Sequence, residues 1–183
     1  MVNRIIGFLL FILLSPFLLI FSILIYIDDG FPILYRQKRI GIHNSIFKVY
    51  KFRTMKNGIP DIATHLVKDP QSFYTKSGFW LRKFSIDEFP QLINIIKGDM
   101  FFVGPRPALH NQDDLIELRT KVEVHTLMPG VTGWAQVNGR DKLNIPIKVK
   151  FDEYYLKNRS WLFDMKIIFL TILKVLGMKD VSH

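Results

Sequence analysis

Apolar residues gather near the two ends of the chain, and charged residues interrupt them in between. Residues 5–27 are almost continuously apolar, and a straight helix of that length could cross a bilayer core of roughly 30 Å. Ser15-Pro16 lies in the middle of this segment, and Pro16 has no N–H to donate to the carbonyl of Ile12. Basic residues flank both ends, whereas a spanning helix usually has them mainly on one side. Two topologies therefore stay open: a kinked spanning helix, and a re-entrant helix that bends at Ser15-Pro16 and returns to the same side.

The last apolar segment, residues 161–176, carries most of its polar side chains on one side of a helical wheel: Asp164, Lys166, Thr171 and Lys174. A bilayer span takes about 20 apolar residues, so this segment is short for one. The pattern predicts an amphipathic helix that lies in the membrane interface.

Two short strands are expected after the first helix, at residues 33–35 and 47–53, and residues 41–45 form the turn between them. The second strand mixes cations with aromatic side chains. Residues 56–78 are polar and contain two glycines and two prolines, which predicts a loop with at most one short helix.

The rest of the chain predicts short helices, with a charged and solvated one at residues 113–124. The other helices are expected at residues 80–84, 90–97 and 150–157. The fold class is therefore α+β. Its parts are an N-terminal membrane helix at residues 1–30 and a small, mostly helical domain at 31–183, with a short β-hairpin and interfacial amphipathic helices.

Composition narrows the function. The 183 residues suffice for one compact domain plus a membrane anchor. The net charge of +9 suits a nucleic acid, an anionic membrane surface or a phosphorylated substrate. The chain has no cysteine, which excludes disulfides, thiol catalysis and cysteine-ligated zinc. Its five histidines form no HExxH pattern.

Two adjacent carboxylates, Asp87 and Glu88, stand just before Pro90. Ser85 and Glu88 match a helix capping box, in which case the carboxylates are local architecture. In the other interpretation the regular helix begins near Pro90, because proline is best placed in a first helical turn. The carboxylates then lie at the entrance of that helix, where free N–H groups keep them ionised, as a nucleophile or a metal ligand must be.

Several cations that could serve the same site come before and after the two carboxylates in the sequence. Lys51 and Arg53 belong to the second strand. One interpretation is that one of them points at a phosphate. The other is that the strand lies in the membrane interface and that its cations snorkel to water. Arg82 comes shortly before the carboxylates. Arg106 lies between Pro105 and Pro107, which fix its backbone. Such a mount suits bidentate contact with a phosphate, although an ordinary Pro-Arg-Pro surface turn fits the same pattern.

A glycine-rich stretch at residues 129–140 is the second candidate for binding. Its glycines permit close approach of the backbone to a ligand. Gln136 and Asn138 could contact a base edge or a sugar hydroxyl, and Arg140 could hold a phosphate. The alternative is a hairpin whose Trp134 anchors it in the membrane interface.

Taken in order, these stretches resemble the monotopic phosphoglycosyl transferases, also called bacterial sugar transferases, in their small minimal form. The resemblance runs from about Arg4 to Leu176. Its motifs are Ser15-Pro16, Tyr50-Lys51-Phe52-Arg53-Thr54-Met55, Leu81-Arg82-Lys83, Ser85-Ile86-Asp87-Glu88-Phe89-Pro90-Gln91-Leu92, Lys97-Gly98-Asp99-Met100, Val103-Gly104-Pro105-Arg106-Pro107 and Pro129 to Arg140. Mild departures from the family pattern are Ile86, Phe89 and Phe101.

The resemblance implies transfer of a phospho-sugar from a UDP-sugar to undecaprenyl phosphate with release of UMP, as the first membrane step of glycoconjugate assembly. It implies Mg²⁺ as cofactor, a catalytic and metal-binding pair on Asp87 and Glu88, a phosphoglycosyl-aspartate intermediate, and a re-entrant break at Ser15-Pro16. Membrane lipid is a further expected partner and nucleic acid is not. The expected location is the cytoplasmic face of the bacterial inner membrane, with 31–183 as the catalytic domain.

Two other functions fit parts of the sequence. A membrane phosphatase could use the same carboxylates and would release phosphate or sugar phosphate without a lipid acceptor. A basic protein that binds anionic lipid or nucleic acid would depend on the net charge alone, and its binding would survive loss of Asp87. The residues do not specify the donor sugar, the prenol length, the pathway or the oligomeric state, a homodimer included.

Overall fold

The computed structural model describes residues 1–56, 73–139 and 142–177. These residues form two compact units, each with its own core. The described residues of the first unit lie within 1–37 and 49–97, and those of the second lie within 38–48 and 98–177. The predicted boundary between a membrane helix at 1–30 and a domain at 31–183 stays a prediction.

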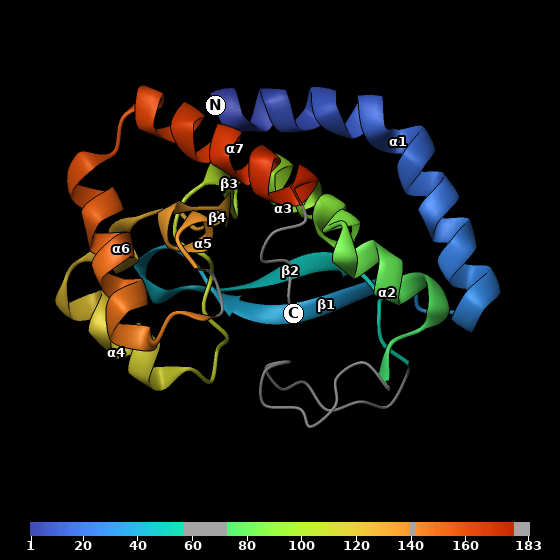
Figure 1. Ribbon diagram of the computed structural model, residues 1–183, viewed down its shortest axis with the longest axis horizontal. Helices are drawn as coiled ribbons and strands as arrows, with labels where there is room; N and C mark the ends of the chain where they lie inside the picture. Colours follow the sequence, from blue (N-terminus) through green and yellow to red (C-terminus); the bar gives the residue numbers. More distant parts are fainter. Residues whose placement is uncertain (57–72, 140–141, 178–183) are drawn as a thin grey trace. The chain divides into compact units, whose positions relative to one another are not determined.

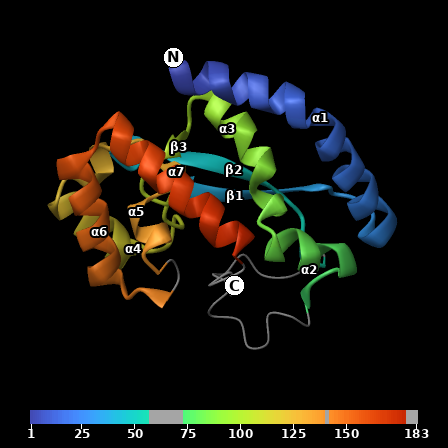
Figure 2. The same ribbon diagram turned by 45° about the horizontal axis from the view of Figure 1, so that its top comes forward.

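The first unit begins with one long helix, α1 (Val2–Asp29), which contains Pro16. The axis of α1 visibly changes direction partway along its length (Figures 1 and 2). Most of its apolar side chains are exposed, and only Gly7 and Ile25 are buried. Within the described part of the chain, α1 is the one helix long and apolar enough to cross a membrane. The predicted N-terminal apolar helix with a bend is therefore confirmed.

Three short elements follow in this unit: α2 (Lys76–Lys83), the 3₁₀ helix η4 (Ile86–Gln91) and α3 (Leu92–Lys97). Both α2 and α3 contact α1, and Figure 2 shows α3 running beside the first half of α1. The core of this unit is built on three buried side chains from three different elements, Ile25, Phe52 and Leu81. The unit therefore holds the apolar helix and the candidate carboxylates on a common core.

The predicted hairpin is confirmed, with longer strands than expected. Strand β1 (Leu34–Ile40) pairs with β2 (Ile46–Phe52), and the short helix η1 (Ile42–Asn44) makes the turn. His43 and Asn44 adopt left-handed backbone conformations there, with φ of 52° and 58°. Asparagine and histidine tolerate this conformation better than most residues, which suits them to a turn.

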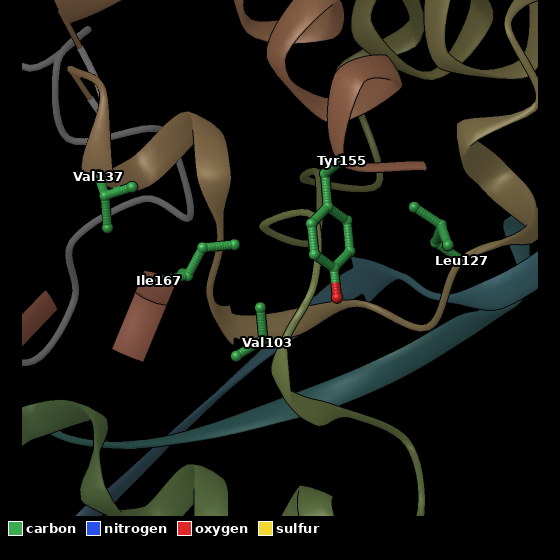
Figure 3. Close-up of a cluster of buried hydrophobic side chains, with 5 residues drawn as sticks. All are labelled: Val103, Leu127, Val137, Tyr155 and Ile167. Atoms are coloured by element: carbon green, nitrogen blue, oxygen red, sulfur yellow. The ribbon is translucent and has the colours of Figure 1, made fainter. Parts of the chain in front are cut away.

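The second unit is mostly helical around a two-stranded parallel pair, β3 (Phe101–Val103) and β4 (Gly130–Thr132). Its helices are α4 (Asp113–Lys121), η5 (Val124–Thr126), α5 (Trp134–Val137), α6 (Ile145–Asn158) and α7 (Trp161–Leu176). Five buried side chains from β3, α5, α6, α7 and the segment before β4 form its main core (Figure 3). These are Val103, Leu127, Val137, Tyr155 and Ile167. The unit thus closes on a core contributed by distant parts of the chain.

Two polar residues of α7, Asp164 and Thr171, face the core of its own unit. Asp164 accepts a hydrogen bond of 2.7 Å from the Tyr155 hydroxyl, and the Thr171 hydroxyl lies 2.7 Å from that of Thr132. The apolar side chains on the opposite arc of the helix are exposed: Trp161, Leu162, Met165, Phe169, Ile172 and Leu173. The outward face of α7 is therefore apolar, the reverse of a helix that faces water.

Candidate active site

The structure decides between the two interpretations of the carboxylate stretch. Ser85 has a left-handed backbone with φ of 56°, and its side chain makes no capping hydrogen bond. The capping-box interpretation is therefore wrong. Asp87 and Glu88 lie in η4, and the regular helix α3 begins at Leu92, two residues later than predicted. The carboxylates thus precede the regular helix, as the second interpretation required.

The two carboxylates differ in environment. Asp87 is buried, with 6% of its surface exposed. Glu88 makes an ion pair with Lys51, whose Nζ lies 2.8 Å from Oε1, and both side chains are largely buried. An ammonium at this distance restricts the orientation of the carboxylate that it pairs with. Lys51, predicted to bind phosphate, is thus brought to the dyad, and its contact with a phosphate stays a prediction.

A buried asparagine that the sequence did not single out connects the strand of Lys51 to the helix after the dyad. Asn94 is fully buried in α3, and its Oδ1 accepts a 3.0 Å hydrogen bond from the backbone N–H of Tyr50. Since Lys51 is the next residue, this bond fixes the strand at the point where the lysine reaches Glu88. The sequence did carry a signal for a buried and hydrogen-bonded side chain here, because Asn94 is the one polar residue within the apolar segment 92–96.

The other two cations of this unit have structural contacts. Arg53 is buried, and its Nη2 donates to the carbonyls of Asp29 and Gly30 at 2.8 and 2.9 Å. The same nitrogen lies 3.1 Å from the Asp29 carboxylate. Arg53 therefore binds the C-terminal end of α1, which attracts cations. Arg82 lies over the ring of Tyr74, with its guanidinium carbon 5.2 Å from the ring centre. Binding of phosphate by Arg53 and Arg82 stays a prediction.

Arg106 belongs to the second unit, where a buried ion pair supports it. The Arg119 guanidinium donates to Asp152 from Nε at 3.0 Å and from Nη2 at 2.6 Å. Its third nitrogen, Nη1, donates to the backbone carbonyl of Arg106 at 2.8 Å. Burial raises the pKa of the Asp152 carboxyl, and the adjacent guanidinium opposes this shift. The expectation of a merely solvated helix at 113–124 missed this inward-facing arginine.

The glycines of the 129–140 stretch are used for contact within the protein. A side chain on Gly130 would come within 2.1 Å of the backbone nitrogen of Gly104, and one on Gly133 within 2.1 Å of its carbonyl oxygen. The glycines thus let two backbone segments meet at the β3–β4 pair. The hairpin alternative is wrong, because β4 pairs in parallel with β3 and α5 follows it.

Gln136 and Asn138, which were predicted to contact a nucleotide or sugar, donate hydrogen bonds to main-chain carbonyls a few residues earlier in the chain. Gln136 donates from Nε2 to the Val131 carbonyl at 3.0 Å, and Asn138 donates from Nδ2 to the Trp134 carbonyl at 2.7 Å. Trp134 packs against Phe163 of α7, with ring centres 4.9 Å apart. Arg140 lies outside the described residues. Recognition of a nucleotide or sugar by these side chains stays a prediction.

The donor set at the dyad fits Mg²⁺. Mg²⁺ is commonly held by one or two carboxylates together with substrate phosphates and water. Asp87 and Glu88 provide two adjacent carboxylates. The described residues contain no group of three or more histidine, cysteine or acidic side chains that could form a complete cage. A metal held by these two carboxylates would complete its coordination with phosphate or water oxygens.

The chain thus combines a long apolar helix, an apolar exposed face on α7 and a carboxylate dyad paired with a lysine. The family model described as "Bacterial sugar transferase" matches residues 1–178. The chain belongs to this family.

Curated relatives agree with the family match. The chain is 42% identical over 159 residues to the uncharacterized sugar transferase EpsL of Bacillus subtilis (strain 168), covering 84% of this chain and 76% of that protein. It is 37% identical over 173 residues to the UDP-glucose:undecaprenyl-phosphate glucose-1-phosphate transferase of Escherichia coli (strain K12), covering 91% of this chain. It is 36% identical over 169 residues to an Aeromonas hydrophila UDP-N-acetylgalactosamine-undecaprenyl-phosphate N-acetylgalactosaminephosphotransferase, covering 90% of this chain. The chain spans 37% and 40% of the lengths of these last two proteins.

Proposed function

We propose that the protein transfers a phospho-sugar from a UDP-sugar to undecaprenyl phosphate and releases UMP. The observation that carries the proposal is the buried Asp87 beside a largely buried Glu88 that pairs with Lys51, in a chain that belongs to the bacterial sugar transferase family. The names of two relatives describe transfer of sugar phosphate to undecaprenyl phosphate, which supports this choice of substrates.

The reaction proceeds in two displacements at one phosphorus. A carboxylate oxygen of Asp87 attacks the phosphorus bonded to the sugar, the bond to the bridging diphosphate oxygen breaks, and UMP leaves with the electron pair. A phosphate oxygen of undecaprenyl phosphate then attacks the same phosphorus and breaks its bond to Asp87. The product is undecaprenyl diphosphate-sugar, and the Asp87 carboxylate is regenerated.

The two carboxylates divide the work. The Lys51 ammonium lies 2.8 Å from Glu88 and orients that carboxylate. The family pattern assigns the attack to Asp87, and Glu88, with Asp87, would hold Mg²⁺. When bound, the metal neutralises charge on the donor diphosphate. Arg106, on its proline-bracketed loop, supplies a planar guanidinium for phosphate oxygens.

The direct test is to incubate the protein with a UDP-sugar and Mg²⁺ in the absence of any lipid acceptor. UMP should appear at about one equivalent per protein, and peptide mass analysis should find phospho-sugar on Asp87. Asp87→Asn should form neither product, whereas Glu88→Gln should react slowly and still give the trapped peptide. If UMP appears only after undecaprenyl phosphate is added, the two-step mechanism is wrong. Release of free phosphate or sugar phosphate would instead indicate a phosphatase.

The membrane topology that fits this reaction is re-entrant, with both ends of α1 on the cytoplasmic face of the inner membrane. The bend in α1, the presence of Pro16 in that helix and the exposed apolar faces of α1 and α7 support it. A lipid-borne phosphate and a soluble nucleotide sugar can then meet at one depth. Because the chain has no native cysteine, Asn3→Cys gives a label with no background. Labelling from the periplasm would contradict the re-entrant topology, and replacing Ser15 and Pro16 with leucine should produce that result.

A further inference from the structure

The backbone of the loop that carries Arg106 is fixed at four consecutive carbonyls. Each accepts a hydrogen bond from a separate donor group, at distances between 2.8 and 3.0 Å. The pairs are Pro105 with the N–H of Gly130, Arg106 with Nη1 of Arg119, Pro107 with Nη1 of Arg39, and Ala108 with the N–H of Ile40. Two prolines already restrict φ in this loop, so little conformational freedom is left to its backbone.

Arg119 makes the contact at the centre of this loop, and it is itself held in place. Two of its nitrogens donate to the same Oδ2 of Asp152, and the third donates to the Arg106 carbonyl. Arg119 comes from α4 and Asp152 from α6, and both side chains are buried, with 9% and 1% exposed. A planar guanidinium fixed on one edge has a fixed direction for its remaining donor.

A buried ion pair is a poor explanation for stability alone. Removing two charges from water costs about as much as their attraction returns, and well-packed apolar residues often do as well. What this pair provides is geometry, because it points one N–H at one peptide carbonyl. The peptide concerned belongs to the residue whose side chain is assigned to the substrate phosphate.

We propose that Arg119 and Asp152 are positioning residues that orient Arg106 toward the diphosphate of the nucleotide-sugar donor. The inference rests on the assignment of Arg106 under the proposed function. Arg119 touches no substrate in this scheme and acts through the Arg106 peptide. Misplacement of a catalytic group by about 1 Å can cost roughly a hundredfold in rate, so the effect on turnover is measurable.

The experiment is a double-mutant cycle on kcat/KM for the donor in the UMP-releasing step. Arg119→Lys keeps a positive charge beside Asp152 but lacks the planar fork that also reaches the Arg106 carbonyl. It should lower kcat/KM by about tenfold to a hundredfold in the parent. In an Arg106→Ala background, where no guanidinium remains to be oriented, the same change should cost less than about twofold.

A control variant and a hydrogen-exchange measurement separate a general effect on folding from a local effect on the Arg106 loop. Thr120→Val is the matched control, since Thr120 is the next residue of α4 and bonds Asn44 at 3.0 Å rather than the loop. It should leave kcat/KM within about twofold of the parent. Hydrogen exchange of the peptide covering residues 104–109 should rise in Arg119→Lys and stay unchanged in Thr120→Val. Asp152→Asn, a second variant that keeps the side-chain shape, should raise this exchange as well.

The outcomes separate the two ideas. Equal losses from Arg119→Lys in both backgrounds would overturn the positioning role while leaving the proposed function intact. So would unchanged exchange at residues 104–109. Parental activity of Arg106→Ala would overturn the assignment of Arg106, and the positioning role with it. A large loss in the parent that vanishes in the Arg106→Ala background supports the inference.

Discussion

Ser15 lies next to the proline of α1, and its hydroxyl leads to a quantitative prediction. In a helix the carbonyl of Ile12 would accept from the N–H of residue 16, and Pro16 has none. The Ser15 hydroxyl donates to this carbonyl at 2.7 Å instead. Serine hydroxyls commonly satisfy backbone groups freed by proline inside membranes, where water cannot. Ser15 is therefore expected to compensate for its neighbour.

Ser22 provides a matched comparison on the same helix. Its hydroxyl donates to the Leu18 carbonyl, also at 2.7 Å. Unlike the Ile12 carbonyl, the Leu18 carbonyl also has a backbone donor in the helix, because residue 22 is not a proline and keeps its N–H. Ser22→Ala should therefore change the free energy of unfolding by less than about 0.5 kcal/mol. In the membrane that the proposed function requires, Ser15→Ala leaves the Ile12 carbonyl without its donor and should cost about 1–3 kcal/mol.

The decisive measurement is a cycle between Ser15→Ala and Pro16→Ala. Alanine at position 16 restores an N–H for the Ile12 carbonyl, so Ser15→Ala should become nearly neutral in that background. The interaction free energy expected is about 1–2 kcal/mol. It can be measured by detergent-denaturation titrations followed by circular dichroism. Equal effects of Ser15→Ala and Ser22→Ala, or a cost of Ser15→Ala that survives Pro16→Ala, would refute this account of Ser15.

Three further predictions concern the second unit. Arg106→Lys keeps the charge but loses the planar fork, so turnover should fall at least about tenfold with an unchanged melting temperature; near-parental turnover would return Arg106 to a surface turn. Gly133→Ala places a methyl group against the Gly104 backbone and should destabilise the protein by about 1–3 kcal/mol or more. Thermal unfolding measures this loss, with Gly41→Ala as the comparison, because the atoms nearest to Gly41 belong to side chains 3.1 Å away. Burial and the hydrogen bond to Asp164 raise the pKa of the Tyr155 hydroxyl, so its stabilisation is complete below about pH 10 and is lost at higher pH, where the unfolded tyrosine ionises first. The stability advantage of the parent over Tyr155→Phe should thus shrink between pH 7 and pH 11, and a constant difference would contradict it.

Local patterns were sufficient wherever one segment determined its own structure. The apolar run predicted α1, and Pro16 predicted its bend, because a missing N–H acts on the helix that contains it. Two short strand-like segments on either side of a turn predicted the hairpin. The dyad of Asp87 and Glu88 was visible as two adjacent carboxylates before a proline, a pattern that needs no knowledge of distant residues.

Tertiary structure decided which partner each charged or small residue would meet. The sequence placed Lys51 and Glu88 in separate elements, and only folding brought them to 2.8 Å. Gly133 looked available to a ligand until the backbone of Gly104 was found to fill the space beside it.

The support of Arg106 shows the same limit most clearly. Arg119 lies on a helix that reads as solvated, and its partner Asp152 is 33 residues further along the chain. Periodicity records which side of a helix is apolar, but an arginine on that helix can equally face water or a buried carboxylate. The choice depends on whether a distant segment delivers the carboxylate, since an arginine is buried at acceptable cost only when such a partner meets it there.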